Sequence, residues 1–197
     1  MIYLVIGIVI AGGAVLILVW FRKVQYDAVH RNFLDLVDKY GGRVMRGGFA
    51  IRPRYSGTFN NSRLAISISS EKKKNGKNRQ FYISIYMQSS GSVNYTILSE
   101  DWMENQSDDK ESKRIFKEIW DSKYLLEVSD ENILKKLDLE KIENIVRRMH
   151  PFAYVLVSKK GLILERVSNN LIKDSEYHNL YPLLEGMYDL GQISVRN

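Results

Sequence analysis

The chain opens with an uninterrupted apolar run and then alternates between charged and apolar positions. Residues 2–21 carry no charged side chain. A helix of that length rises about 30 Å, at about 1.5 Å per residue, which is the thickness of the hydrocarbon core of a bilayer. Tyr3 lies near one end of the run and Trp20 with Phe21 at the other, where aromatic rings prefer the headgroup level. The pattern predicts a transmembrane anchor that occupies residues 1–23.

A cleaved signal peptide is the alternative explanation of such a run. It would have a basic segment in front, a shorter apolar stretch and a cleavage site made of small residues. Here no charged side chain precedes the run, and bulky residues close it before Arg22 and Lys23. We therefore expect an uncleaved signal-anchor.

The basic residues around the run predict its orientation. Arg22, Lys23, Arg31 and Lys39 follow the run and no basic residue precedes it, and the positive-inside rule keeps such a flank in the cytoplasm. We expect a single-pass protein of the cell membrane, with its N-terminus outside and its C-terminal domain in the cytoplasm. The absence of cysteine agrees with a reducing compartment, because no disulfide can form.

Small residues gather in the middle of the run. Gly7 and Ala11 form a small-xxx-small pair, and Ala14 lies about one turn further on. This spacing lets two membrane helices approach closely. One such pair also arises by chance, because glycine is frequent in membrane helices. The spacing predicts helix packing at this face, with a homodimer through the transmembrane helix as its simplest form.

Residues 24–42 continue the helix beyond the run, because apolar residues recur every three or four positions until two glycines stop the helix. The stripe consists of Tyr26, Val29, Phe33, Leu36 or Val37, and Tyr40, and the stop is Gly41 with Gly42. We expect this juxtamembrane helix to pack on its own domain. The alternative is a short parallel coiled coil that extends a dimer out of the membrane, although about two to three heptads are few for one.

Between residues 43 and 99 the apolar period changes to two, which is typical of strands with one buried face. We expect four strands that follow one another as an antiparallel β-meander, namely 52–59, 63–69, 81–87 and 93–97. Leu64, Ile66 and Ile68 share the predicted buried face of the second strand. The other face is expected to be at least partly solvated.

Residues 100–197 mix helices and strands. We expect a polar loop over 100–110, a short helix over 111–120, a strand over 123–128, helices over 131–137 (capped by Asp130) and 139–149, a hairpin over 153–167, and a final helix opened by Asp174 or Ser175. Strands and helices that are segregated along the chain indicate the α+β class. Residues 24–197 are numerous enough to form one soluble domain with a closed hydrophobic core.

Several segments resemble a known group of proteins. Residues 121–130 are DSKYLLEVSD, and residues 161–166 are GLILER before the closing helix. Together with Tyr55-Ser56-Gly57 in the preceding sheet, this order resembles single-pass membrane-anchored proteins of prokaryotes whose function is unknown. The resemblance implies a shared architecture and a prokaryotic source, and it brings no activity.

The sequence contains no recognisable catalytic or metal-binding motif. His30, His150 and His178 are far apart in the sequence and lack the spacing of metal ligands. Without cysteine, thiol chemistry is excluded. Gly76-Lys77-Asn78 lacks the upstream glycine and the hydroxyl residue of a P-loop. We predict no catalytic residue, no metal and no cofactor; the alternative is a membrane-tethered enzyme whose site is assembled from distant residues.

Charge is distributed unevenly along the chain. Residues 22–99 carry 14 Lys and Arg against 4 Asp and Glu, a net charge of +10, whereas residues 100–197 have a net charge of −4. The candidate lipid- or phosphate-binding residues lie in the basic half: Arg22, Lys23, Lys72, Lys73, Lys74, Lys77 and Arg79. Each basic residue at an anionic leaflet contributes about 1 kcal/mol, so membrane lipid is the expected partner. The alternative is a hairpin tip that is basic only for solubility.

Nucleic acid is the less favoured partner. Lysine runs bind phosphate without reading bases, and Phe81, Tyr82 and Tyr86 on the adjacent strand offer rings for stacking. No nucleic-acid motif accompanies them. The sequence therefore predicts a membrane-anchored binding or scaffold domain, or an accessory subunit of a membrane complex, that contacts anionic lipid and other proteins.

Overall fold

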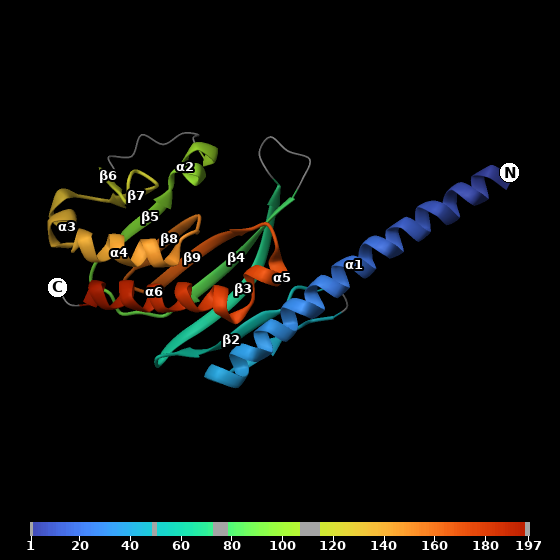
Figure 1. The fold of residues 1–197 in the computed structure, drawn as a ribbon, viewed down its shortest axis with the longest axis horizontal. Helices are drawn as coiled ribbons and strands as arrows, with labels where there is room; N and C mark the ends of the chain where they lie inside the picture. The colour runs from blue at the N-terminus through green and yellow to red at the C-terminus, as the bar shows by residue number, and fades with distance from the viewer. Residues whose placement is uncertain (1, 49–50, 73–78, 107–114, 196–197) are drawn as a thin grey trace.

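The computed structural model describes residues 2–48, 51–72, 79–106 and 115–195 (Figure 1). Helix α1 (Ile2–Tyr40) is one continuous helix of 39 residues. It joins the apolar run to the stripe that follows it, as predicted. Its first half is long and apolar enough to cross a membrane.

Two glycines end α1 and turn the chain into the sheet. Gly41 has φ = +69°, and its amide donates a hydrogen bond to the carbonyl of Val37 at 2.8 Å. Gly42 has φ = +92° and lies against the backbone of Gly57. Glycine adopts this left-handed conformation at no steric cost. The predicted stop at these two glycines is confirmed.

A single antiparallel sheet of nine strands in the described residues follows α1. Its order is β1-β2-β3-β4-β9-β8-β5-β7-β6. The strands are β1 (Arg43–Met45), β2 (Arg54–Phe59), β3 (Ser62–Lys72), β4 (Arg79–Met87), β5 (Tyr95–Ser99), β6 (Ile115–Ile119), β7 (Tyr124–Val128), β8 (Tyr154–Ser158) and β9 (Gly161–Ser168). The α+β class is confirmed.

One predicted strand position is wrong. Strands β2, β3 and β4 form the expected meander, but β5 does not continue it. Instead β5 pairs with β7 and β8, and β9 occupies the place beside β4. The ladder between β4 and β9 joins seven residue pairs, which is more than the five residues of β5 could supply. Strand neighbours are selected by such long-range packing, which the local period does not encode.

Two segments between residues 100 and 120 also differ from the prediction. Glu100–Gln106, expected as a loop, is helix α2, and the Ser99 hydroxyl accepts a hydrogen bond from the Trp102 amide at 3.3 Å at its start. Ile115–Ile119, expected within a helix, is strand β6. Two residues four positions apart share one side of a helix and also one side of a strand, and pairing with β7 selects the strand.

The remaining helices are α3 (Glu131–Lys136), α4 (Leu139–Met149), α5 (Leu171–Asp174) and α6 (Tyr177–Val195). The Asp130 carboxylate caps α3 by accepting two backbone amides, as predicted. The expected start of the last helix at Asp174 or Ser175 is wrong. These residues end the short helix α5, with Ser175 as its C-cap, and α6 begins at Tyr177.

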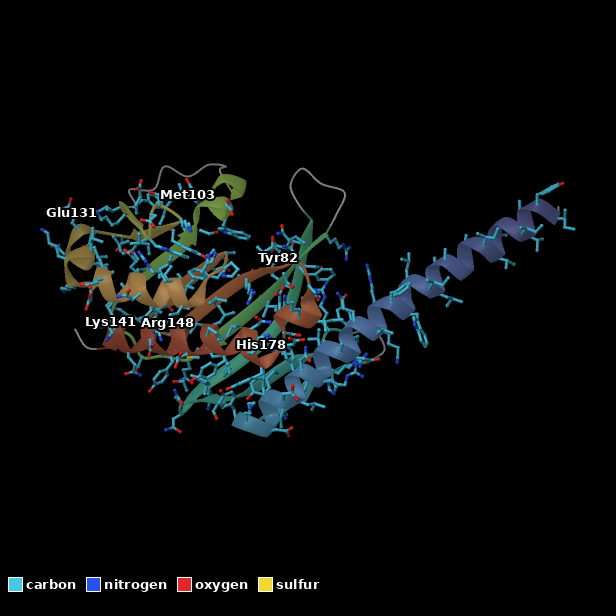
Figure 2. The ribbon with its side chains drawn as sticks, in the orientation of Figure 1. Tyr82, Met103, Glu131, Lys141, Arg148 and His178 are labelled. Carbon is cyan, nitrogen blue, oxygen red and sulfur yellow. The ribbon has the colours of Figure 1, made fainter. Side chains whose placement is uncertain are left out.

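Helices α1, α4 and α6 cover one face of the sheet (Figure 1). The core between them includes Val29, Phe33, Leu36, Ile66, Ile85, Leu164, Leu180 and Leu184. The α1 stripe thus packs on its own domain, as predicted, and the coiled-coil alternative is wrong because the stripe is already buried. An ion pair of 2.6 Å between Arg148 of α4, labelled in Figure 2, and Asp189 of α6 joins the two neighbouring helices.

Candidate functional site

The edge of the domain next to the apolar half of α1 is basic. Asp27 of α1 forms ion pairs with Lys23, at 3.0 Å, and with Arg46, which follows β1. Hydrogen bonds from Arg46 and then Lys23 hold the pKa of Asp27 below its ordinary value. One carboxylate therefore joins two cations and fixes the segment after β1 to α1.

Arg52 makes a second link at this edge. Its guanidinium donates to the Tyr26 hydroxyl at 3.4 Å and to the Ser70 hydroxyl at 2.5 Å. Tyr26 lies on α1 and Ser70 near the end of β3, so the end of β3 is held beside the point where α1 enters the domain. In Figure 1, the paired ends of β3 and β4 and the first half of α1 extend toward the same side of the domain.

The predicted lipid-binding residues are placed as follows. Arg22 and Arg79 are exposed, and Lys23 is paired with Asp27. Lys72 ends β3 and pairs through its backbone with Arg79 at the start of β4. Lys73, Lys74 and Lys77 lie outside the described residues. The structure therefore brings Arg22, Lys23, Lys72 and Arg79 to one side of the domain, which is called the basic edge.

Arg46 and Arg52 belong to the same edge and were not predicted as site residues. Their partners on α1 are 19 and 26 residues away in sequence. No local spacing signals such contacts, because they depend on how the first strand is placed against the helix. The residue types, two arginines within a basic segment, were the only available signal.

The small residues of the apolar half face no other part of the described chain. Gly7, Ala11 and Ala14 are exposed on α1, and a Cβ atom added to Gly7 would meet no other atom within 4 Å. Helix packing through this face stays a prediction.

The sheet face opposite α1, α4 and α6 is called the open face. The strand register places one row of residues across all nine strands: Arg43, Ser56, Ala65, Tyr86, Ile163, Leu156, Thr96, Glu127 and Phe116. This is the first row. The second row runs beside it from Ser67 through Ser84, Glu165, Tyr154, Leu98 and Leu125 to Glu118, and Arg54 with Met45 extend it toward β1.

Apolar side chains of the first row are partly exposed. Tyr86, Ile163 and Leu156 are neighbours on β4, β9 and β8, with 40%, 37% and 37% of their surface accessible. Phe116 at the end of the row is 46% accessible. A contiguous apolar strip on a sheet face is typical of a contact surface.

The two ends of the open face differ in charge. Arg43 and Arg54, on β1 and β2, are exposed, and neither has an ion-pair partner among the described residues. Glu118, on β6 at the other end, is exposed and accepts a hydrogen bond from the Ser122 hydroxyl at 2.6 Å. The open face is therefore basic at one end and acidic at the other.

A carboxyl group lies near the centre of the open face. Glu165 accepts a hydrogen bond from the Ser84 hydroxyl at 2.9 Å, and burial raises the pKa of Glu165 above its ordinary value. Beside it, the Trp102 ring of α2 lies 5.7 Å from the ring of Tyr82 and 5.6 Å from that of Tyr154. Tyr82 is buried beneath this contact (labelled in Figure 2). Tyr82 is therefore not available to stack on a base, whereas Tyr86 of the same strand is exposed, and the nucleic-acid interpretation stays a prediction.

A polar contact surrounded by aromatic rings lies between the β6–β7 turn and the end of α4. The Tyr124 hydroxyl is 3.0 Å from Nδ1 of His150, and it also accepts a hydrogen bond from the Phe152 amide at 3.2 Å. Burial raises the pKa of Tyr124 to about 12 and lowers that of His150. Both side chains are therefore uncharged at neutral pH, and their bonds hold the segment before β8 in place.

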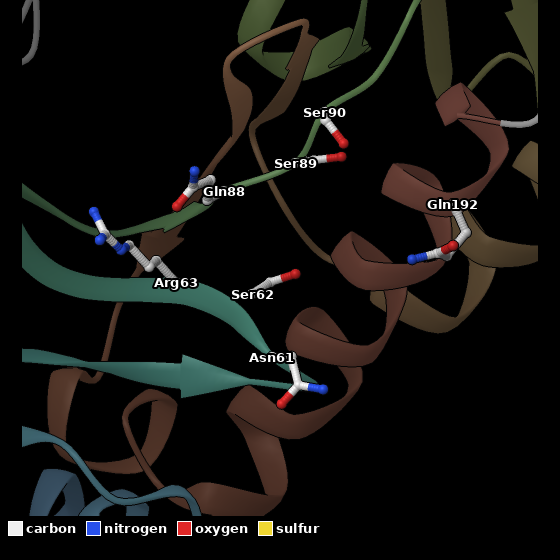
Figure 3. Close-up of a pocket in the computed structure, with 7 residues that line it drawn as sticks. All are labelled: Asn61, Ser62, Arg63, Gln88, Ser89, Ser90 and Gln192. Carbon is white, nitrogen blue, oxygen red and sulfur yellow. The ribbon is translucent and has the colours of Figure 1, made fainter.

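A polar cleft of about 530 Å³, shown in Figure 3, lies where β3 begins, beside α6. This is the opposite end of β3 from Lys72 and the basic edge. Its lining consists of Asn61, Ser62, Arg63, Gln88, Ser89, Ser90 and Gln192. The lining contains one guanidinium, three carboxamides and three hydroxyls, with no carboxylate or imidazole. It can form hydrogen bonds to a polar molecule, but it supplies no acid–base pair for catalysis.

The described residues contain no group of three or more His, Asp or Glu side chains that could hold a metal ion. Comparison with protein families, with curated proteins and with solved structures finds no match to this chain. Its function has to be inferred from its own helix, basic edge and open face.

Proposed function

We propose that this chain is a single-pass membrane protein whose C-terminal domain is a binding module, held by its basic edge against the anionic surface of the cytoplasmic leaflet. One observation carries the proposal. Helix α1 continues without interruption from an exposed apolar half into a half that is buried in the core of the domain. No flexible linker separates the candidate membrane span from the domain.

The exposure of the apolar half supports membrane insertion. Val9, Ile10 and Leu16 are among many large apolar side chains there that are exposed. A soluble protein rarely exposes so extended an apolar surface. In a bilayer, each Ile, Leu, Val or Phe near the centre of the span contributes about −0.3 to −0.6 kcal/mol.

The continuity of α1 supports lipid contact by the basic edge. Because the helix enters the core directly, it fixes which side of the domain faces the membrane. That side carries Arg22, Lys23 and Arg79, together with the ends of β3 and β4. Each basic residue at an anionic surface contributes about 1 kcal/mol, and the anchor supplies a high effective concentration.

The rest of the domain is then free to bind other molecules. The polar cleft lies at the far end of the sheet, and the open face is the side of the sheet opposite the helix layer. A domain that is fixed on a membrane and presents two uncovered surfaces has the arrangement expected of a scaffold or an accessory subunit.

A pair of labelled variants tests the lipid contact. The natural chain has no cysteine, so Glu71→Cys, near the end of β3, and Ser90→Cys, in the polar cleft, each give a unique site for an environment-sensitive dye. Both residues are exposed. In nanodiscs that contain the full chain and anionic lipid, we expect a blue-shifted emission from the first label that high salt reverses, because salt screens exposed charges. The second label serves as the control.

The same control variant tests the orientation. A membrane-impermeant maleimide added to intact cells should label Ser90→Cys only after permeabilisation. Labelling of intact cells would place the domain outside and overturn the cytoplasmic part of the proposal. Equal emission from both nanodisc labels, or emission that ignores anionic lipid, would overturn the lipid contact.

A further inference from the structure

The first row of the open face is apolar in its centre, and the two ends of the face are oppositely charged. Tyr86, Ile163 and Leu156 form the exposed centre of the first row. Arg54 and Glu118 lie in the second row, on β2 and β6. Helix α2 reaches the open face through Trp102, which covers Tyr82 and leaves the first row accessible.

The strand order places these features on both sides of β9, with Arg54 on the third strand from β9 and Glu118 on the fourth strand from it. This strand is the fifth of nine in the sheet order, so it is the central one. Tyr86 and Leu156 lie on the strands to either side of Ile163. Arg54 lies on the second strand and Glu118 on the ninth. A rotation of 180° about an axis along β9 therefore brings the basic end of the sheet over the acidic end.

Sheet twist does not obstruct this arrangement. Rotation about the central strand converts a twisted sheet into one of the same twist, so two copies can stack at a constant separation. Sheets that pack face to face in an aligned manner lie about 10 Å apart. At that distance an arginine side chain reaches a carboxylate on the facing sheet, even when the two lie one strand apart.

We infer that the open face binds the open face of a second copy of this chain. A two-fold axis that lies midway between the two sheets, parallel to β9, relates the copies. Tyr86 packs on Leu156 of the partner subunit, and Arg54 pairs with Glu118 of the partner subunit. Every contact of this kind occurs twice in a two-fold interface. The occupant is a second copy because the face is complementary to itself, basic end to acidic end.

Glu165 is the charged residue nearest the axis. Its carboxyl group is half-buried and accepts the Ser84 hydroxyl within its own sheet. Because Glu165 lies on β9, the axis places it opposite its own copy. Burial raises the pKa of Glu165 and so favours the neutral form, in which two facing carboxyl groups do not repel each other.

The direction of the axis also agrees with two copies in one membrane. Copies inserted in the same direction are related by rotation about the membrane normal, and the ends of β3 and β4 point to the same side as the apolar half of α1 (Figure 1). This agreement rests on the proposed membrane anchoring; the contact between the sheets does not.

Crosslinking of the full chain tests which face is involved. Ile163→Cys places a unique thiol near the axis, and Ile172→Cys, on α5, is a control of the same residue type with matched exposure, 38% against 37%. With a short bis-maleimide, in detergent and in native membranes, we expect at least about fivefold more crosslinked dimer from Ile163→Cys. Equal yields, or no dimer from Ile163→Cys, would overturn the inference.

Charge reversal tests the pairing itself. Because like charges that meet in an interface are strongly unfavourable, Arg54→Glu and Glu118→Arg should each weaken self-association about tenfold. A mixture of the two variants should associate as strongly as the natural chain, since each glutamate then meets an arginine. Both substituted residues are exposed, and an unfolding transition like that of the natural chain verifies that each variant is folded. A mixture that stays as weak as its components would overturn the pairing.

A third variant separates this interface from a dimer made by the span. Gly7→Leu fills the small-residue face of the apolar half, and crosslinking at Ile163→Cys should survive it unchanged. Loss of the crosslink would assign the contact to the span and overturn the sheet interface. The detergent experiment needs no bilayer, so a failure of membrane docking leaves its result unaffected.

Discussion

The two halves of helix α1 consist of the same kinds of residue in opposite surroundings. Ile10 in the first half is 67% exposed, whereas Phe33 in the second half has no exposed surface. In the first half apolar residues cover every side of the helix, and in the second they form one stripe between polar positions. A helix that is apolar all round is suited to a membrane or to the core of a large protein, and a helix with one apolar stripe is suited to a protein surface. The arrangement of the apolar positions therefore distinguishes the half that is packed on the domain from the half that we propose to lie in the membrane.

The largest expected effect is the loss of the buried stripe. Phe33→Ala should lower the free energy of unfolding of the domain by about 3–5 kcal/mol, because it removes a fully buried ring from a closed core. The measurement is urea unfolding of the full chain in mild detergent, followed by tryptophan fluorescence. Ile10→Ala is the matched control in the other half and should leave this transition in place. If both changes had the same effect, the two halves would not differ as described.

A charge in the first half should act on insertion alone. Ile10→Arg is expected to disfavour insertion by about 3 kcal/mol, the cost of an arginine near the centre of a span. Leu34→Arg is the control, because Leu34 is exposed on the second half of α1, which is packed on the domain and is called the docked half. The fraction of each variant in carbonate-washed membranes measures the difference. An equal loss for both variants would mean that the first half is not the anchor.

The halves of α1 also show how far the fold could be predicted from the sequence. The stripe, the glycine stop and the Asp130 cap are local features, and they were predicted correctly. The position of β9 beside β4 was missed because it depends on a ladder between residues about eighty positions apart. The start of α2 had a local signal that was overlooked, namely Ser99 followed by the acidic residues Glu100 and Asp101.

The candidate site divides in the same way. Basic residues near the span could be identified from composition, since the two parts of the chain differ in net charge. The links from Asp27 to Arg46 and from Tyr26 to Arg52 could not, because they join the helix to a segment that only the fold brings near. The open face had a period-two signal, but its opposite ends come from strands far apart in the sequence, β1 and β6.

A smaller effect is expected where the docked half ends. Gly42→Ala should cost about 1–3 kcal/mol, because φ is +92° there and the new methyl group would meet the backbone of Gly57. Gly41→Ala is the matched control: φ is +69°, but no atom lies within 4 Å of the added group. Its loss should be the smaller of the two in the same urea experiment. A larger loss for the control would show that the contact with Gly57 contributes nothing.

The smallest effect concerns the ion pairs at the boundary between the halves. The pKa of Asp27 is lowered in the folded protein by Arg46 and Lys23, so its charged form stabilises the fold. That contribution is present above the unfolded value of 3.8 and disappears as the pH falls through the lowered folded value. Asp27→Asn should therefore lower stability slightly at pH 7, and the difference from the natural chain should shrink below pH 3.8.

Asp35→Asn is the control for this comparison, since Asp35 is exposed on the same helix and has no ion pair among the described residues. Urea unfolding of both variants at pH 7 and at pH 3 checks the sign. A stability difference for Asp27→Asn that persists unchanged into acid would attribute the effect to packing of the side chain instead of its charge. High salt should also reduce the difference at pH 7, because both cations that meet Asp27 are partly exposed and are screened. The domain would then lose only a weak clamp, while the stripe behind it keeps α1 docked.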